Sequence, residues 1–377
     1  MDPFVAAAAQ EIAVRAEREL EALVAVSSPS GDIPGAEEAL AVCVALLPSQ
    51  ARTERVASST PQSAPDLIAR IDGEGTRRML LVGHVDTVVA HEAHGPLRRE
   101  GDRLYGPGTA DMKGGVVIAL GVARELAARP ELFAELSLLL VTDEEWRTQP
   151  FVHAAAFAGY DACLCFEAGQ REPGGEGVVV RRKAAGTLRV TATGRSAHSG
   201  SAPDQGANAL LALAQTAIAV TRLHEPDGAE RLSVVPTVVR SGRAFNVVPA
   251  EGELIFDIRA ERSESFQRVL AAVPAKIDGV GVQARLERVW PGMDAREATA
   301  RLLERASEKV GRPIVAASRG GASDASHFAN SIPLTVDGLG PRGGGAHTPE
   351  EFVVAESLAE RAQVALAVAL EALEAEP

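Results

Sequence analysis

The sequence predicts an α/β protein in which a small ferredoxin-like unit is inserted into a larger domain. Three observations lead to this fold class. Helical and strand-like segments alternate in the first half of the chain, the pattern changes to β-α-β-β-α-β near residue 183, and the alternation then resumes. We therefore expect a discontinuous larger domain of residues 1–182 and 292–377, and an inserted domain of residues 183–291. A chain of 377 residues is long enough for two domains.

The first half contains helices with a regular apolar face and strands that are almost wholly apolar. Such strands are typical of a parallel sheet whose two faces are covered by helices. Helices are expected at residues 7–26 and 114–130, and strands at residues 77–89, 135–145 and 161–169.

The inserted unit contains strands that alternate apolar and polar residues, which indicates a sheet with one exposed face. Its expected elements are strand 187–194, helix 206–224, strands 231–242 and 252–261, helix 263–277 and strand 281–290. The larger domain then continues with helix 296–311, strands 312–318 and 332–340, and helix 356–373.

Composition narrows the class of protein. Apolar residues make up 46% and charged residues 24%, and the net charge is −13, which argues against a nucleic-acid partner. Three cysteines are too few for a disulfide framework, so Cys163 and Cys165 are interpreted as core residues. No apolar run reaches the roughly 18 residues of a membrane span. Charged residues near the start of the chain do not suit a signal peptide, so we expect a cytoplasmic protein without a membrane partner.

Side chains capable of metal binding or acid–base chemistry follow the predicted strands. His84 and Asp86 end an apolar strand, where burying an unpaired polar group costs about 1–3 kcal/mol. Because residues i and i+2 of a strand point to the same side, Asp86 can accept the second ring N–H of His84 and fix its tautomer. At or beyond other strand ends lie Asp111, Glu144, Glu145, Glu167 and His347.

Imidazoles and carboxylates that converge at the carboxyl edge of a parallel sheet would form a metal site. They suit Zn²⁺, and one carboxylate can bridge two ions about 3.5–4 Å apart. Adjacent Glu144 and Glu145 cannot point the same way, so one could bind metal while the other acts as a general base. However, a histidine that ends a strand is usually just hydrogen-bonded, and paired glutamates before a helix usually complement its dipole. Spacing alone leaves both explanations open.

Four motifs carry a family resemblance: GHVDTV, YGPGTADMKGG, TDEE and FEAG. They resemble those of the aminoacylase, glutamate carboxypeptidase and succinyl-diaminopimelate desuccinylase family of dinuclear zinc hydrolases, with the greatest likeness to the bacterial glutamate carboxypeptidases. The resemblance covers nearly the whole chain and implies a zinc-peptidase-like catalytic domain with an inserted lid and dimerisation domain.

The resemblance also implies roles for individual residues. Asp111 would bridge two Zn²⁺ ions, with Co²⁺ or Mn²⁺ as alternatives, and the Asp111–Met112 peptide bond would be cis. His84 and Glu167 would complete one metal site, and Glu145 and His347 the other. Glu144 would be the general base and Asp86 would orient His84.

The inserted domain shares further motifs with this family. In TGRSAHSGSAPDQGANAL, the resemblance implies that His198 reaches the active site of a partner subunit and polarises the scissile carbonyl, so a homodimer is expected. In FNVVPAEGELIFDIRAE, it implies substrate contacts by Asn246 and Arg259, although Arg259 could instead form an ion pair on the strand face. The RGGASDASHFA segment resembles a loop that lines the substrate pocket around Gly321 and Ser323.

The chain departs from the family pattern directly after its Glu pair. The family usually continues with one residue and then Gly-Ser or Gly-Ala, whereas this chain reads Trp146, Arg147, Thr148, Gln149 and Pro150. The adjoining loop is therefore bulkier, which puts in doubt any substrate transferred from a relative. The remaining histidines match no ligand position and are interpreted as surface or loop residues: His91, His94, His153, His224 and His327.

The expected function is hydrolysis of an amide bond in an N-acyl amino acid or small peptide that bears a free carboxylate. Glu144 would take a proton from a metal-activated water and later deliver it to the leaving amine. A desuccinylase, deacetylase or dipeptidase of the same family is an alternative. A catalytically silent dimeric binding protein would be expected to have a damaged ligand set, and a phosphoesterase would need a phosphate-binding motif that the sequence does not show.

Overall fold

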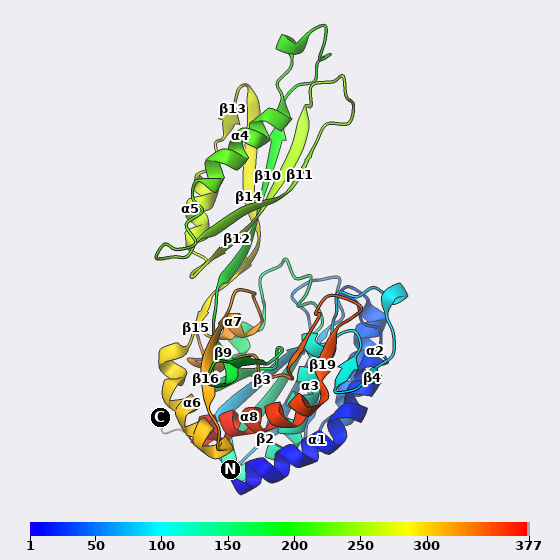
Figure 1. Cartoon of the computed structure of the whole chain (residues 1–377), viewed down its shortest axis with the longest axis vertical. Helices are drawn as coiled ribbons and strands as arrows, with labels where there is room; N and C mark the ends of the chain where they lie inside the picture. Colours follow the sequence, from blue (N-terminus) through cyan, green and yellow to red (C-terminus); the bar gives the residue numbers. More distant parts are fainter. Residues whose placement is uncertain (375–377) are drawn as a thin grey trace.

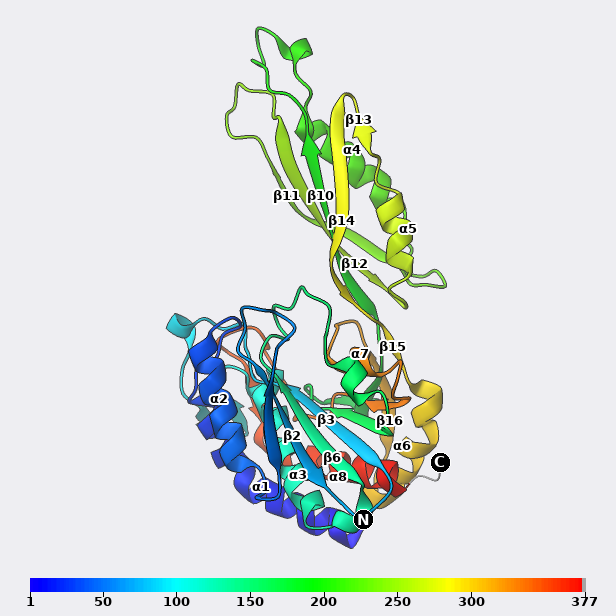
Figure 2. The same ribbon diagram turned by 180° about the vertical axis from the view of Figure 1, so that it is seen from behind.

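The computed structural model describes residues 1–374 and shows a broad lower part from which an elongated upper part projects (Figures 1 and 2). The chain enters the upper part between β9 (Gly175–Arg182) and β10 (Ala184–Thr193) and returns between β14 (Val280–Trp290) and β15 (Met293–Asp294). The α/β fold class with an inserted unit is confirmed. The predicted domain limits stay a prediction, and residues 375–377 of the larger domain lie outside the described residues. Within residues 1–374, no helix combines the length and apolar character needed to cross a membrane.

A six-stranded sheet forms the centre of the lower part. In spatial order its strands are β1 (Arg52–Val56), β2 (Asp66–Asp72), β6 (Glu135–Val141), β3 (Arg78–His84), β7 (Ala162–Cys165) and β17 (Leu334–Val336). The last four are parallel, whereas β1 and β2 are antiparallel to their neighbours. The expected parallel sheet is therefore only part of a mixed one. The sequence pattern missed β1 because its residues are mostly exposed and polar.

Helices cover one face of this sheet, where Met79 and Leu81 of β3 enter the main hydrophobic core. These helices are α1 (Pro3–Val24), α2 (Ile33–Leu46), α3 (Gly114–Ala127), α6 (Arg296–Val310) and α8 (Ala355–Glu374). Local sequence signals set their ends. The Asp2 carboxylate accepts hydrogen bonds from the first-turn N–H groups of α1, and α6 ends at Gly311, whose φ of 74° favours glycine.

The opposite face is not covered mainly by long helices, contrary to expectation. Leu80 and Val82 of β3 instead pack against a second sheet and the short helix α7 (Ala325–Phe328). This sheet contains β15, β9 and β16 (Ile314–Arg319), with β8 (Gln170–Glu172) alongside β9. The sequence predicted β16, but not β9, its parallel partner. A further small sheet of the lower part contains β18 (Gly343–Gly344), β19 (Phe352–Val354), β5 (Arg103–Tyr105) and β4 (Arg98–Glu100).

The upper part has the β-α-β-β-α-β order that the sequence predicts. Its antiparallel sheet has the order β11–β12–β10–β14–β13, which leaves β11 at a free edge. Leu188, Phe256 and Phe266 lie in its separate core. The remaining elements are α4 (Ala209–Thr221), β11 (Ser233–Ser241), β12 (Glu251–Ala260), α5 (Ser265–Ala271) and β13 (Lys276–Ile277).

Candidate metal centre

The carboxyl end of β3 places His84 in a buried, hydrogen-bonded position. Its Nδ1 lies 3.0 Å from the Asp86 backbone oxygen and 3.3 Å from the Asp86 carboxylate. The Asp86 carboxylate also accepts hydrogen bonds from the Ser30 hydroxyl and from the backbone N–H groups of Glu144 and Glu145, at 2.6, 3.2 and 3.1 Å. Asp86 therefore links the imidazole of His84 to the backbone of the Glu pair.

Asp111 lies between two imidazoles. One carboxylate oxygen is 3.1 Å from Nε2 of His84, and the other is 3.1 Å from Nε2 of His347. Asp111 belongs to a helical turn, Thr109–Lys113, and its peptide bond to Met112 is cis, as the resemblance predicts. His347 lies on an exposed loop, and its Nε2 is 3.2 Å from the Glu145 carboxylate. The Glu167 carboxylate lies 3.9 Å from Nε2 of His84.

The charges of these groups perturb one another strongly. Burial raises the pKa of Glu145 to about 7 and that of Glu144 to about 8, and it raises the pKa of Glu167 well above the usual range. Hydrogen bonds from His347 and His84 outweigh the burial of Asp111 and lower the pKa of its carboxyl. The hydrogen bond to Asp111 raises the pKa of His347 to about 9. Several carboxyl groups thus share a space in which negative charge is poorly compensated.

The chemistry of this donor set fits two divalent cations. Potential ligand atoms of His84, Asp111 and Glu167 lie within 4.8 Å of one another, as do those of Asp111, Glu145 and His347. Asp111 is common to both groups and directs one oxygen to each histidine. Oε1 of Glu145 is buried and accepts no hydrogen bond within residues 1–374, and its nearest charged neighbour there is Nε2 of His347 at 3.2 Å. A cation would satisfy this oxygen and offset the crowded carboxylates.

A cavity of about 490 Å³ adjoins these groups. Its lining includes Glu144, Glu145 and Asp111 together with four arginines from the inserted unit and the lower part, which we call the cationic wall: Arg182, Arg259, Arg288 and Arg319. Arg259 pairs with Asp257 at 3.0 Å, and Arg182 pairs with Asp337 at 2.6 Å. Arg288 has no ion-pair partner in the described part of the chain, and its buried Nε has no hydrogen-bond acceptor there. The cavity therefore combines an acidic metal-binding side with a cationic wall.

Comparisons with known proteins identify the family. The model of peptidase family M20/M25/M40 matches residues 80–371. The chain belongs to this family. It is therefore a hydrolase of a metal-dependent peptidase family whose members act on peptides or acyl-amino acids, and the family resemblance predicted from the four motifs is confirmed.

Individual relatives agree with this assignment. The chain is 28% identical over 365 residues to carboxypeptidase G2 of Pseudomonas sp. (strain RS-16), an alignment that covers 92% of this chain and 86% of the relative. It is 29% identical over 310 residues to a succinyl-diaminopimelate desuccinylase of Stenotrophomonas maltophilia, covering 76% and 81% of the two chains.

Solved structures show the same fold. The structure of aminopeptidase PepT from Bacillus cereus superposes with a TM-score of 0.77 at 21% identity and covers 96% of this chain and 99% of that one. The M20 family metallo-carboxypeptidase Sso-CP2 from Sulfolobus solfataricus has a TM-score of 0.75 at 14% identity and full coverage of both chains.

Not every predicted site residue of this M20 hydrolase lies at the cavity. Gly321 lines it, but the Ser323 hydroxyl is fully buried and donates a hydrogen bond to Asp337 at 2.6 Å. The expectation that Ser323 faces the pocket is therefore wrong, because the buried Asp337 carboxylate draws its side chain inwards. His198 and Asn246 lie on adjoining loops, joined by a hydrogen bond from the Ser199 N–H to the Asn246 oxygen. Figure 1 shows the loop that follows His198 at the far end of the upper part.

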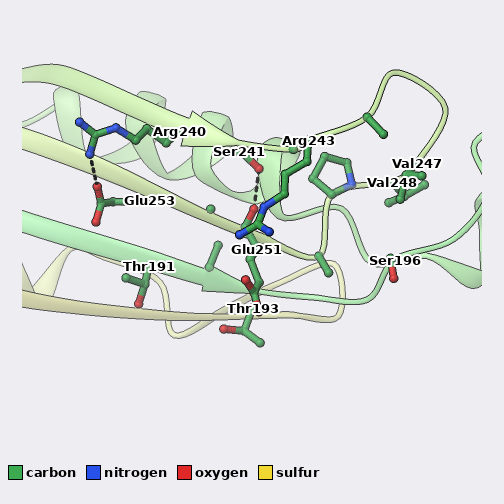
Figure 3. A pocket seen from close by; sticks show the side chains of 16 residues that line it. Thr191, Thr193, Ser196, Arg240, Ser241, Arg243, Val247, Val248, Glu251 and Glu253 are labelled. Atoms are coloured by element: carbon green, nitrogen blue, oxygen red, sulfur yellow. Dashed lines mark hydrogen bonds and ion pairs between the residues drawn. The ribbon is translucent and has the colours of Figure 1, made fainter.

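A larger hollow of about 740 Å³ lies near these two loops and not at the metal residues (Figure 3). Arg240 and Glu253 form an ion pair of 3.0 Å on its wall, and the Ser241 hydroxyl donates to the Glu251 backbone oxygen. Arg240, Glu253 and the Ser241 hydroxyl on this wall therefore already have partners. The smaller cavity is the candidate active site, because it contains the carboxyl groups whose pKa values are raised.

The remaining histidines are partly as predicted. His91, His94 and His224 lie on loops or a short turn. His153, however, is buried and its Nε2 is 2.7 Å from the Asp66 carboxylate. His327 belongs to α7 and stacks on Phe151 with ring centroids 4.7 Å apart. His153 therefore lies on a loop, as predicted, although it is buried. The prediction for His327 is wrong, because it lies in a helix and packs against a ring distant in sequence.

Three further functional candidates were not predicted from the sequence. Arg288 and Arg319 line the cavity, and Glu351 accepts a hydrogen bond from the Asp111 backbone. Arg288 reaches the cavity from a strand in which charged and apolar residues alternate. Nothing in that local pattern distinguishes it from a surface residue such as Arg285. Glu351 follows the HTPE segment and is buried, so a carboxylate next to a ligand-bearing loop was the available signal.

Proposed function

We propose that this protein is a two-metal hydrolase that cleaves the amide bond of an N-acyl amino acid or small peptide with a free carboxylate. The observation that carries the proposal is the position of Glu144. Its carboxyl group lines the cavity and clusters with His84 and Glu145, but it belongs to neither of the two groups that share Asp111. A carboxylate beside a metal site, but outside the bridged set, suits a general base.

The proposed ligands follow from the two clusters around Asp111. His84 and Glu167 would hold one ion, and Glu145 and His347 the other, with Asp111 shared. We propose Zn²⁺ for both sites, with Co²⁺ or Mn²⁺ as alternatives, because imidazole and carboxylate suit these ions. When bound, the ions would act as Lewis acids and make water a stronger acid.

The proposed reaction moves one proton twice. Glu144 accepts a proton from water as the water oxygen forms a bond to the amide carbon. Glu144 then donates that proton to the amide nitrogen as the carbon–nitrogen bond breaks, which gives a carboxylic acid and an amine. Asp86 supports this step by fixing both His84 and the backbone of the Glu pair.

The cationic wall supports a substrate with a free carboxylate. Arg259 and Arg288 face the cavity from β12 and β14 of the inserted unit. A guanidinium binds a carboxylate through two parallel hydrogen bonds, and the buried Nε of Arg288 has no hydrogen-bond acceptor within residues 1–374. We propose that the substrate carboxylate lies against this wall while its amide lies near Glu144.

We also propose that His198 and Asn246 act in the active site of a second subunit. Nδ1 of His198 accepts backbone hydrogen bonds from Gly200 and Ser201 at 3.1 and 3.2 Å, which leaves Nε2 as an exposed donor. The inserted unit offers a surface for a second copy. Leu211 and Ile218 of α4 and Val239 of the edge strand β11 are more than half exposed.

One assay separates the candidate substrates. Purified enzyme is dialysed against chelator, reloaded with Zn²⁺ or Co²⁺, and assayed on acyl-glutamates, succinyl and acetyl amino acids, and dipeptides. We expect amide hydrolysis that disappears with the metal and returns on reloading. Metal-independent hydrolysis, or no hydrolysis of any substrate by the reloaded enzyme, would contradict the proposal. The expected cytoplasmic location stays a prediction.

A further inference from the structure

Trp146, which directly follows the Glu pair, contributes the one large aromatic ring among the residues that line the metal-side cavity. Its side chain is 65% exposed, although burial of a Trp side chain strongly favours folding. The other apolar lining residues are small and include Val88, Ala185 and Ala322. The ring therefore presents an unpartnered flat apolar surface next to Glu144 and Glu145.

The neighbouring Arg147 holds the backbone of this loop. Arg147 is almost fully buried and pairs with Asp143 at 3.0 Å and with Asp324 at 2.5 Å. Its guanidinium also lies over the rings of Phe151 and Trp290, 4.7 and 4.8 Å from their centroids. Breaking such a buried network is costly, so the backbone next to Trp146 cannot easily move.

A turn lies near one edge of the ring. A Cβ placed on Gly31 would lie 3.9 Å from the Trp146 ring, so the indole rests close to this turn. The turn is itself tied to the site, because Ser30 donates a hydrogen bond to the Asp86 carboxylate. The backbone beside Trp146 is thus held by Arg147, and the turn at Gly31 lies near one edge of the ring, which lines the cavity.

We propose that Trp146 is a specificity-determining residue that stacks against a planar aromatic group of the substrate. The inference rests on the proposed amide hydrolysis and adds the substrate class: acyl amino acids or peptides with an aromatic group next to the scissile amide. A flat indole gains most from a flat ring in offset or edge contact, whereas an acetyl group is too small to cover it. The carboxylate end of the same substrate would face Arg259 and Arg288.

The test compares N-benzoyl with N-acetyl derivatives of L-glutamate, L-leucine and L-alanine. Binding is measured by equilibrium titration of the metal-loaded Glu144→Gln variant, so turnover is not needed, and kcat/KM is measured with Glu144 intact. Trp146→Ala should lose about tenfold in affinity and in kcat/KM for the benzoyl compounds and less than threefold for the acetyl compounds.

Two further variants distinguish stacking from apolar bulk. Trp146→Phe should retain most of the benzoyl preference, whereas Trp146→Leu should lose it. Val14→Ala removes a comparably exposed apolar side chain from α1 and should change neither ligand class. Benzoyl compounds that stack on Trp146 should quench its fluorescence. Because the chain has two tryptophans, the quenching that disappears in Trp146→Phe is assigned to Trp146.

The outcomes distinguish the stacking role of Trp146 from the proposed amide hydrolysis. If benzoyl and acetyl ligands weaken equally in Trp146→Ala, or if Trp146→Leu behaves as wild type, the stacking role is wrong while amide hydrolysis stands. If the metal-loaded enzyme cleaves none of the six compounds, and none of the succinyl amino acids and dipeptides either, the proposed function fails, and the aromatic specificity fails with it. If it cleaves only the succinyl amino acids or dipeptides, the aromatic specificity alone is wrong.

Discussion

The buried carboxylate of Glu351 accepts a hydrogen bond of 2.7 Å from the backbone N–H of Asp111, the residue that contacts both site histidines. The same carboxylate accepts N–H groups of Gly108 and Ala110 at 2.8 and 2.7 Å. Glu351 follows His347 by four residues, so it ties the loop of one candidate ligand to the backbone of another.

Glu351→Ala should therefore loosen the metal site and destabilise the fold. Leaving buried N–H groups without an acceptor costs about 1–3 kcal/mol each, and metal affinity should fall roughly 10–100-fold. Thermal unfolding and metal content after dialysis measure the two effects. Glu350→Ala is the matched control, because Glu350 is exposed and pairs only with surface Arg98 in the described chain. Equal metal retention by both variants would contradict this role.

Glu144→Gln should keep both metals and lose most turnover. The amide has nearly the same shape as the carboxyl group but cannot accept the proton from water, and a general base contributes about 10²–10⁴-fold to the rate. Metal analysis and kcat are measured on the same sample. Glu145→Gln is the companion variant and should lose metal as well as activity. A Glu144→Gln enzyme with normal kcat would show that another residue is the base.

A mixture of two inactive variants tests whether His198 acts across subunits. Glu144→Ala and His198→Ala should each be nearly inactive alone. After subunit exchange, a mixed dimer contains one site with intact Glu144 that receives His198 from its partner, so a 1:1 mixture should recover roughly a quarter of wild-type activity. Analytical ultracentrifugation checks the dimer. An active monomer, or mixed dimers without activity, would disprove action in trans.

Arg259→Ala should raise KM for substrates with a free carboxylate. Losing a charge-assisted hydrogen bond of about 1.5–3 kcal/mol corresponds to roughly a 10–100-fold loss in kcat/KM. Substrates whose carboxylate is converted to an amide should be much less affected. Arg285→Ala changes an exposed arginine of the same sheet that pairs with Glu287 and serves as the control. An identical loss for both kinds of substrate would indicate that Arg259 only maintains structure through Asp257.

His327 should make the fold sensitive to mild acid. Burial, aided by the nearby charges of Arg147 and Arg288, lowers the pKa of His327 from its ordinary value of 6.5 to about 4. Between these values the unfolded chain binds a proton that the folded chain does not, so stability is complete above pH 6.5 and decreases as pH falls towards 4. The slope from this residue is at most about 1.4 kcal/mol per pH unit.

Urea unfolding of wild type and His327→Phe at several pH values isolates this contribution. The phenyl ring preserves stacking with Phe151 but does not titrate. The unfolding free energy of wild type should therefore fall relative to that of His327→Phe as the pH decreases from 6.5 to 4. Parallel stability curves over that range would exclude His327 as the titrating group.

The local sequence determined the kinds of elements and the chemistry at their ends. Apolar runs predicted β3, β6 and β7, and a change to alternating residues at residue 183 predicted the inserted antiparallel sheet. Because the carboxyl ends of parallel strands meet at one edge, the positions of His84, Glu144 and Glu167 were enough to suggest a shared site. The strands β1, β2 and β9 were not predicted. The residues of β1 are mostly exposed and polar, and in the buried strands β2 and β9 charged residues and glycines interrupt the apolar run.

Only the tertiary structure decided which of these side chains meet. It placed Asp111 between His84 and His347, directed Ser323 away from the cavity towards Asp337, and placed the loop that follows His198 at the far end of the inserted unit. It also brought Arg288 to the cavity that Glu144 lines. Periodicity fixes only the face on which a residue lies. Contacts between groups more than a hundred residues apart depend on how whole sheets and loops pack, which no short stretch of sequence encodes.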